Sequence, residues 1–271
     1  MLNVTRIYFQ DEHCAVIYKT AGEDSQSFYT GFFPQAPFAA PVNRLDTPVS
    51  GLLVIAFSAR IQTVLSRAFA EHRVIKEYRA ICERRTVEPA YLTEPGLLHR
   101  LEHRIGFNAK KRKAFIGSTP ASGKNAKTAK EKAAALKDAV LYWRLCGKGE
   151  RYDFLQIFPE TGRTHQIRAQ MAHTGRPVKG DLKYGARRSE KNGGIRLHCF
   201  GLRFTHPVTG ASLSIQAAPQ QTDPLWTACM EACAGYAGQL PENTVGVPVK
   251  MSAYRTVSTQ KAVEEADCEK I

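Results

Sequence analysis

The sequence contains no Cys-x-x-Cys pair, and its 7 cysteines are an odd number, so neither a disulfide framework nor a cysteine-rich zinc site is indicated. We interpret them as reduced thiols, with Cys229 and Cys233 packed in a core one helical turn apart. No apolar run reaches the roughly 18 residues of a membrane-spanning helix. The first residues lack the charged and then apolar layout of a signal peptide. These absences predict a cytoplasmic protein without membrane contact.

Acidic residues are few compared with basic ones. There are 38 Lys plus Arg against 25 Asp plus Glu, a formal net charge of +13. This excess predicts a polyanionic partner such as RNA, although charge alone also fits DNA or an anionic membrane. With 271 residues, of which 43% are hydrophobic, the chain can bury a substantial core in one large domain or two lobes.

Metal-ligand spacing is also missing. His165 and His173 are eight residues apart and do not share a helix face, and a strand-like segment separates His198 from His206. The stretch Gly117–Asn125 nearly matches a phosphate-binding loop, but it is one residue too long and ends in Asn instead of Ser or Thr. The sequence therefore predicts no metal, no nucleotide cofactor and no other cofactor.

A carboxylate and a cation stand close together early in the chain. Arg44 and Asp46 are two residues apart, and Pro48 and Gly51 follow in a predicted tight loop before the buried strand expected at 52–57. A carboxylate presented on a rigid loop beside a cation suits a catalytic acid, base or nucleophile. Taken alone, the pair is better explained as an ordinary Arg–Asp pair that closes a surface turn.

These residues also carry a resemblance. Arg44-Leu45-Asp46, followed by Ser50-Gly51-Leu52-Leu53, resembles the active-site motif H-R-L-D-x-x-T-S-G-L-L of the RluA-type pseudouridine synthases. Asn43 and Val49 stand where that family has His and Thr. Neither position is the carboxylate or the arginine, so the predicted chemistry is retained.

A second block is similar to the same family. Residues 161–168, Thr-Gly-Arg-Thr-His-Gln-Ile-Arg, match its G-R-T-H-Q-I-R segment and continue to the Gly-Asp-x-Lys-Tyr-Gly stretch of 180–185. Weaker matches lie at 76–80 and 195–198. Two long motifs in the family's order, about a hundred residues apart, identify the chain as a member from about Ile7 to about Pro219.

The resemblance implies an isomerase that converts specific uridines of rRNA or tRNA to pseudouridine without a cofactor. It assigns Asp46 as the catalytic carboxylate and Tyr78 as a phenol beside the uracil, which flips into the site. Arg168, near the start of an expected helix, is the preferred cation to pair with Asp46. Arg163 is the alternative, or it contacts a phosphate.

Other residues are expected to bind the substrate. Arg44 could fill the gap that the flipped uridine leaves in the RNA stack, and Leu197 could form an apolar wall under the uracil. The segment 108–138 is rich in lysine and is interpreted as a mobile basic loop followed by a short helix. Its Lys110, Lys111 and Arg112 would track phosphates, unless the segment is only a solvated insertion.

The fold expected from the family is α+β, with a mixed, mainly antiparallel central sheet, flanking helices and an active-site cleft across the sheet. Short strand-like runs with few long helices between them agree with this class: 52–57, 77–81, 154–158, 197–204 and 212–217. Residues 1–240 form the predicted catalytic domain, without the N-terminal S4-type RNA-binding domain of many relatives. Residues 241–271 are a partly disordered extension, and a monomer is the simplest assembly.

Two rival functions are considered. One is a catalytically silent RNA-binding or RNA-folding protein, which would have no use for a carboxylate facing a polyanion. The other is a carboxylate-dependent nucleosidase, which needs a second Asp or Glu that is not found near Asp46.

Overall fold

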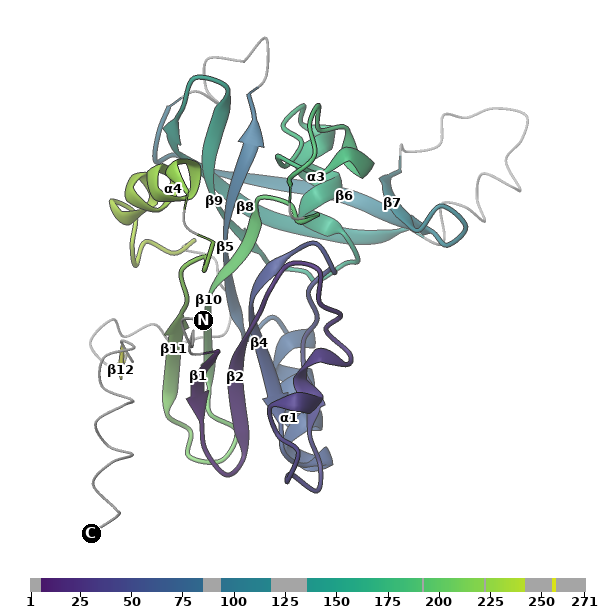
Figure 1. Cartoon of the computed structure of the whole chain (residues 1–271), viewed down its shortest axis with the longest axis vertical. Helices are drawn as coiled ribbons and strands as arrows, with labels where there is room; N and C mark the ends of the chain where they lie inside the picture. The colour runs from purple at the N-terminus through teal and green to yellow at the C-terminus, as the bar shows by residue number, and fades with distance from the viewer. Residues whose placement is uncertain are drawn as a thin grey trace. The chain divides into compact units, whose positions relative to one another are not determined.

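The computed structural model describes residues 6–84, 94–117, 136–191, 193–221, 223–241 and 255–256, shown in colour in Figure 1. The chain divides into two compact units. The first comprises Met1–Tyr78, His198–Thr222 and Glu242–Ile271, and the second Arg79–Leu197 and Asp223–Pro241. The chain passes from the first unit to the second within one strand, β5 (Ile75–Glu83).

The first unit is built on a sheet in which antiparallel pairs flank a central parallel pair. In spatial order its strands are β1 (Ile7–Gln10), β2 (Cys14–Lys19), β4 (Ser50–Ala56), β10 (Leu197–Thr205) and β11 (Ser212–Gln216). β4 and β10 are parallel, and the other three pairs are antiparallel. The short strands β3 (Ala40–Pro41) and β12 (Arg255–Thr256) pair with β4 and β11.

Two strands form the centre of this unit's core. Every residue of β2 is buried, and so is every residue of β4 except the first. Because both faces of these strands are covered, their sequences are nearly continuous runs of apolar residues. Helix α1 (Ala59–Ala70) contacts β4. Ser58 caps its N-terminus, because the Ser58 side chain accepts a hydrogen bond from the Ile61 amide at 3.2 Å. A short 3-10 turn, η1 (Phe28–Gly31), lies in the connection between β2 and β3.

The close approach of β4 to β10 depends on Gly51. Its φ is +126°, and a Cβ there would lie 2.4 Å from the carbonyl oxygen of Cys199. One position earlier, the Ser50 hydroxyl lies 2.9 Å from His198 Nδ1. His198 Nε2 donates to the Ala217 carbonyl at 2.7 Å, so Nδ1 accepts from Ser50. The Ser-Gly pair of the first motif therefore fixes how two core strands meet.

The second unit contains a second run of neighbouring strands. In spatial order they are the last residues of β5, then β9 (Tyr152–Pro159), β8 (Lys137–Lys148), β6 (Leu98–Asn108) and β7 (Lys113–Ile116). The pairs β8–β9, β6–β8 and β6–β7 are antiparallel. Helix α3 (Gln166–His173) packs on β6 and β7, and α4 (Pro224–Ala234) packs on β8 and β9. The 3-10 turn η3 (Leu182–Tyr184) contacts α3.

The predicted α+β class with a mixed, mainly antiparallel sheet and few helices is confirmed. The five predicted strand runs coincide with β4, β5, β9, β10 and β11 to within two residues at each end. The cleft and the domain limits at 240 and 241 stay predictions. Among the described residues, no helix has the length and apolar character needed to cross a lipid bilayer.

The prediction for 108–138 was wrong at both of its ends. Residues 113–116 form β7, which pairs with β6 through a tight turn at 109–112, and residues 137–138 already belong to β8. The expected short helix falls in 118–135, outside the described residues. Most of the predicted extension 241–271 also lies outside them.

Candidate active site

The loop that carries Asp46 is a tight turn in the first unit. The Val49 amide donates to the Asp46 carbonyl at 2.9 Å, which closes the turn before β4. Leu45 and Val49 are buried, Asp46 is partly buried, and Arg44 is exposed. The predicted tight turn is present, and the Arg44 side chain on it is exposed to solvent.

Tyr78 belongs to the same unit as Asp46 and lies on β5, which neighbours β10. Burial raises the pKa of its phenol well above 10, and the Cys199 side chain and the Asp46 carboxylate raise it further. Burial also raises the pKa of the Cys199 thiol, to about 12. The phenol is therefore neutral at physiological pH, next to a neutral thiol and within the field of Asp46. Sequence reasoning did not foresee Cys199 as its neighbour.

Arg168 is the third residue of α3 and is fixed within the second unit. Its Nε and Nη2 donate to the Asp181 carboxylate at 2.6 and 2.9 Å, and its guanidinium lies 4.9 Å from the centre of the Tyr184 ring. The side chains of Arg168 and Asp181 are both buried, so this bidentate pair holds the cation in one position. Asp181 stands in the matched 180–185 stretch, but its role as the partner of Arg168 was not predicted.

The G-R-T-H-Q-I-R segment is held together by Gln166. Its side-chain oxygen accepts from the Thr161 hydroxyl at 2.7 Å and from the Arg163 amide at 3.0 Å, and its nitrogen donates to Val140 at 3.0 Å. His165, the residue before α3, has a positive φ of 55°. The motif thus encodes a compact turn that starts α3 two residues before Arg168.

The two candidate partners of Asp46 have different surroundings in the second unit. Arg168 is buried, whereas Arg163 is exposed and donates from Nε to the Asp138 carbonyl at 2.9 Å. Because Asp46 belongs to the first unit, its pairing with Arg168 or Arg163 stays a prediction. Leu197, only 3% exposed, is the first residue of β10.

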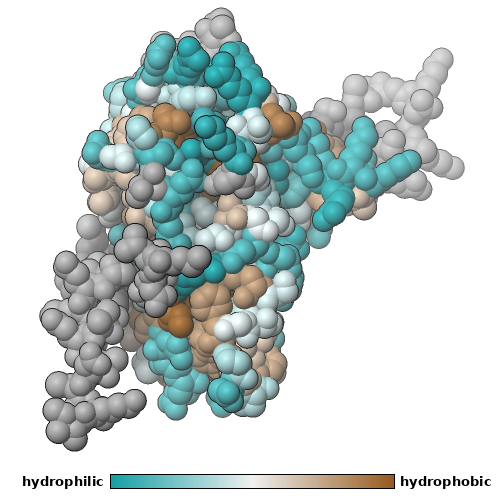
Figure 2. All heavy atoms as spheres, viewed as in Figure 1, coloured by the Kyte–Doolittle hydropathy of each residue, from teal (hydrophilic) through white to brown (hydrophobic). Residues whose placement is uncertain are grey.

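The basic residues Lys110, Lys111 and Arg112 are exposed in the turn between β6 and β7. Phe107 and Phe115 on the adjoining strands are 48% and 47% exposed. In Figure 2 the end of this hairpin is covered mainly by hydrophilic side chains. A cationic turn flanked by accessible aromatic faces is a surface suited to single-stranded nucleic acid. The phenylalanines were not predicted, because burial depends on strand pairing that the sequence does not show.

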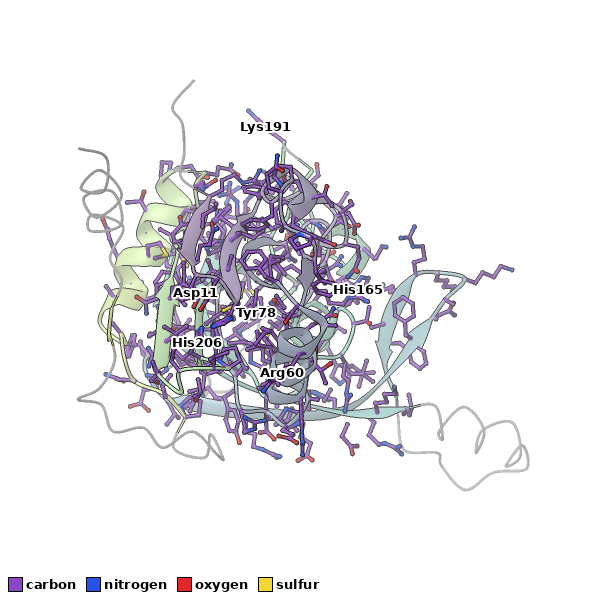
Figure 3. All side chains as sticks on the ribbon, turned by 90° about the horizontal axis from the view of Figure 1, so that it is seen from below. Asp11, Arg60, Tyr78, His165, Lys191 and His206 are labelled. Carbon is purple, nitrogen blue, oxygen red and sulfur yellow. The ribbon has the colours of Figure 1, made fainter. Side chains whose placement is uncertain are left out.

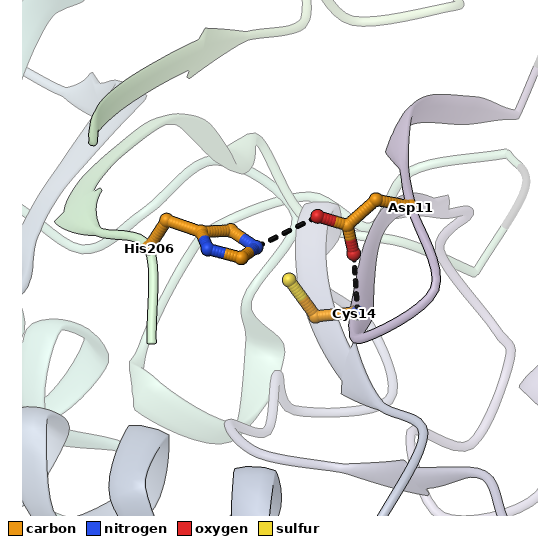
Figure 4. Close-up of side chains that lie close together, drawn as sticks. All are labelled: Asp11, Cys14 and His206. Carbon is orange, nitrogen blue, oxygen red and sulfur yellow. Dashed lines mark hydrogen bonds and ion pairs between the residues drawn. The ribbon is translucent and has the colours of Figure 1, made fainter. Parts of the chain in front are cut away.

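One group of potential metal ligands occurs in the described part of the chain. Atoms of Asp11, Cys14 and His206 lie within 4.8 Å of one another, at the β1–β2 turn and the end of β10 (Figures 3 and 4). His206 Nε2 donates to Asp11 at 2.7 Å, while Nδ1 accepts from the Thr209 amide at 3.0 Å. Binding a metal through Nε2 would force a proton onto Nδ1, against that amide. Burial also raises the pKa of the Cys14 thiol to about 12, so we interpret the cluster as a structural tie.

Comparison with known proteins agrees with this geometry. The family described as RNA pseudouridylate synthase matches residues 13–173. The chain therefore belongs to the RNA pseudouridylate synthase family, and the RluA-type assignment made from its motifs is confirmed. It is an RNA pseudouridine synthase, an enzyme of the isomerase class.

Several bacterial relatives are similar over most of the chain. The tRNA pseudouridine synthase C of Vibrio parahaemolyticus is 29% identical over 80% of this chain and 91% of its own length. That of Pectobacterium carotovorum is 26% identical over 87% of this chain, which spans 64% of the relative's length. The ribosomal large subunit pseudouridine synthase D of Vibrio parahaemolyticus is 30% identical over 68% of this chain and 53% of its own length.

Solved structures share the fold. The human RNA pseudouridylate synthase domain containing 4 superimposes with a TM-score of 0.62 and 17% identity, covering 84% of this chain and 92% of its own. The human RNA pseudouridylate synthase domain containing 1 gives 0.59 and 23%, covering 82% and 86%. These likenesses bear on the fold alone.

Proposed function

We propose that this chain, acting as a monomer in the cytoplasm, isomerises specific uridines of tRNA to pseudouridine with Asp46 as its catalytic carboxylate. The observation that carries the proposal is that Asp46, on a closed turn, and the partly buried, neutral phenol of Tyr78 belong to the same unit, where the Asp46 charge raises the pKa of the phenol. Three relatives given above support RNA as the substrate, and two of them are named for tRNA. Ribosomal RNA is the second candidate, because the third is named for the large ribosomal subunit.

The reaction conserves every atom of the nucleoside. The N1–C1′ bond breaks, the uracil turns, a C5–C1′ bond forms, C5 loses a proton and N1 gains one. The Asp46 carboxylate can attack C1′ as a nucleophile, stabilise the cationic sugar electrostatically, or remove a proton. No electron is gained or lost overall, so the isomerisation needs no oxidant.

The other site residues are assigned roles around that step. Tyr78 stacks on the uracil and exchanges a proton through its hydroxyl, and Leu197 supports the base. In this proposal the guanidinium of Arg168 balances the negative charge of Asp46, and Arg163 contacts a phosphate of the RNA. The exposed Arg44 enters the RNA stack when the uridine flips into the site.

Tyr78→Phe is expected to lower kcat by about 10²-fold, with KM little changed, because it removes the hydroxyl and keeps the ring. Single-turnover rates on saturating RNA measure the effect. Tyr29→Phe, a change of the same kind at a partly buried tyrosine of this unit, serves as the matched control. A Tyr78→Phe rate equal to that of the unchanged protein would limit Tyr78 to stacking.

Replacing Lys110, Lys111 and Arg112 by alanine is expected to weaken RNA binding at least tenfold. If all three contact phosphates, the slope of log affinity against log salt falls by about 2, while kcat on saturating RNA is retained. Binding titrations at several salt concentrations test this. The control replaces three exposed arginines of the first unit, Arg60, Arg67 and Arg73. Equal losses in both variants would mean that the hairpin adds only general charge.

Tritium release from C5-labelled uridine distinguishes the candidate substrates. Unmodified tRNA transcripts are expected to release tritium, and unmodified ribosomal transcripts are not. Release from ribosomal RNA alone would favour the second candidate. Binding of both RNAs without release would favour the catalytically silent RNA-binding protein.

A further inference from the structure

A buried lysine lies directly against the turn that carries Asp46. Lys19, the last residue of β2, is 0% exposed, and its ammonium group donates three hydrogen bonds. The acceptors are the carbonyls of Thr20 at 2.9 Å, Thr47 at 3.1 Å and Val49 at 2.7 Å. Two of the three lie on the Asp46 turn, so this side chain joins the end of β2 to the catalytic loop.

The residues after Lys19 hold the same turn from a second side. The Gly22 amide donates to the Thr47 carbonyl at 2.8 Å. The buried Ser25 hydroxyl donates to the Leu45 carbonyl at 2.8 Å and accepts from the Leu45 amide at 3.1 Å. Backbone groups both before and after Asp46 are therefore bound by residues 19–25, while its carboxylate takes no part in these bonds.

We infer that Lys19 and Ser25 are positioning residues for the isomerisation: they fix the backbone on both sides of Asp46, and the Lys19 ammonium also lends that carboxylate a nearby positive charge. The inference rests on the proposed catalytic role of Asp46. A displacement of about 1 Å at a reacting group can cost about 10²-fold in rate, so holding this backbone has a direct catalytic effect.

Lys19 is buried among charged groups that largely balance. Glu23 and Asp24 follow it in sequence, Asp46 lies on the turn whose carbonyls it binds, and Arg6 precedes β1. Arg6 forms an ion pair with Glu23, whose carboxylate also accepts from the Thr20 amide at 2.8 Å. Arg6 therefore already partners Glu23, and Asp46 is a further carboxylate that favours the charged form of Lys19.

Burial lowers the pKa of Lys19 from 10.5 to about 8, although the Glu23, Asp46 and Asp24 carboxylates act in the opposite direction. The ammonium group therefore begins to lose its proton near pH 8, and it then loses donors that hold the turn.

The contribution of Lys19 to the free energy of unfolding changes with pH in the opposite direction to the activity. Between about pH 8 and 10.5 the unfolded chain binds more protons at this site, so this group makes unfolding less favourable as pH rises. Activity is expected to fall where this group's contribution to stability increases.

The test compares Lys19→Met and Ser25→Ala with two controls at exposed residues, Lys191→Met and Ser27→Ala. At pH 7 we expect kcat for tritium release to fall about 10- to 100-fold in the first two variants, with KM within about twofold. The controls stay within about twofold of the unchanged protein. A loss confined to KM, or a kcat within twofold in both test variants, would overturn the inference.

A pH profile separates positioning from a purely structural role. The kcat of the unchanged protein is expected to decline above pH 8, and Lys19→Met is expected to lack that decline. Both proteins act on the same RNA, so a decline caused by the RNA would appear in both. The same decline in Lys19→Met would show that Lys19 is not the titrating group.

Amide hydrogen exchange gives a readout that does not depend on activity. The Val49 amide, which closes the Asp46 turn, is expected to exchange at least about tenfold faster in Lys19→Met, while amides of the β2–β4 pair are unchanged. Unchanged Val49 exchange would contradict the inference even if no RNA were modified, whereas an inactive unchanged protein would contradict only the proposed function. If Lys19→Met fails to fold, Ser25→Ala carries both readouts.

Discussion

Asp46→Asn is expected to abolish pseudouridine formation, with kcat reduced by at least about 10³-fold, because the amide can neither attack the sugar nor balance its positive charge. RNA binding should be retained or slightly tightened, since one negative charge facing a polyanion is removed. Single-turnover tritium release measures the loss, and binding titration on the same RNA confirms that the substrate still docks.

The matched control is Asp138→Asn. Asp138 is exposed, and its carboxylate only forms a surface ion pair with Arg104 at 3.6 Å. We expect its kcat to stay within about twofold of the unchanged protein. Comparable losses in both variants would mean that Asp46 acts through folding or general charge, and the catalytic assignment would be wrong.

Gly51→Ala is expected to destabilise the first unit by about 3 to 5 kcal/mol, the largest stability effect of any single substitution considered for this chain. The added Cβ would lie 2.4 to 2.7 Å from three backbone atoms of Cys199, where no flexible side chain can yield, and the φ of +126° is itself strained for alanine. Such a loss is a large part of the roughly 5 to 15 kcal/mol that stabilises a typical domain. Urea unfolding measures the change.

Gly31→Ala is the control for this prediction. A Cβ at Gly31 would meet nothing within 4 Å, and its φ is not in the left-handed region. We expect a change of less than about 0.5 kcal/mol in the free energy of unfolding. A Gly51→Ala protein as stable as Gly31→Ala would show that the β4–β10 pairing can separate at this point.

The sequence predicted those features that depend on residues close together in the chain. The strand that follows Asp46 was found because its apolar residues are consecutive. The turn at Asp46 was predicted from Pro48 and Gly51. Each of these signals is local, so no knowledge of the fold was needed to use it.

The long strand β6 was not predicted, for a physical reason. Its apolar residues Leu98, Leu101 and Ile105 have the spacing of a helix face, and charged residues occupy most positions between them. What makes it a strand is pairing with β8 on one side and β7 on the other. The pairing with β8 joins residues far apart in the chain, such as Leu98 and Arg144, and short-range periodicity does not report it.

Several partners in the candidate site were missed for the same reason. Cys199 adjoins Tyr78, and Asp181 binds Arg168, through contacts that arise only when the sheet is formed. The three hydrogen bonds of Lys19 to loop carbonyls could not be predicted from composition or spacing either. The sequence motifs indicated the candidate site residues, and the fold shows which neighbouring residues contact them.

The most direct test of the account is tritium release from C5-labelled, unmodified total RNA incubated with the purified chain. The account predicts release at a limited number of uridines, with pseudouridine appearing in the same RNA and neither product formed by Asp46→Asn. RNA that binds to the protein but yields no tritium and no pseudouridine would contradict it.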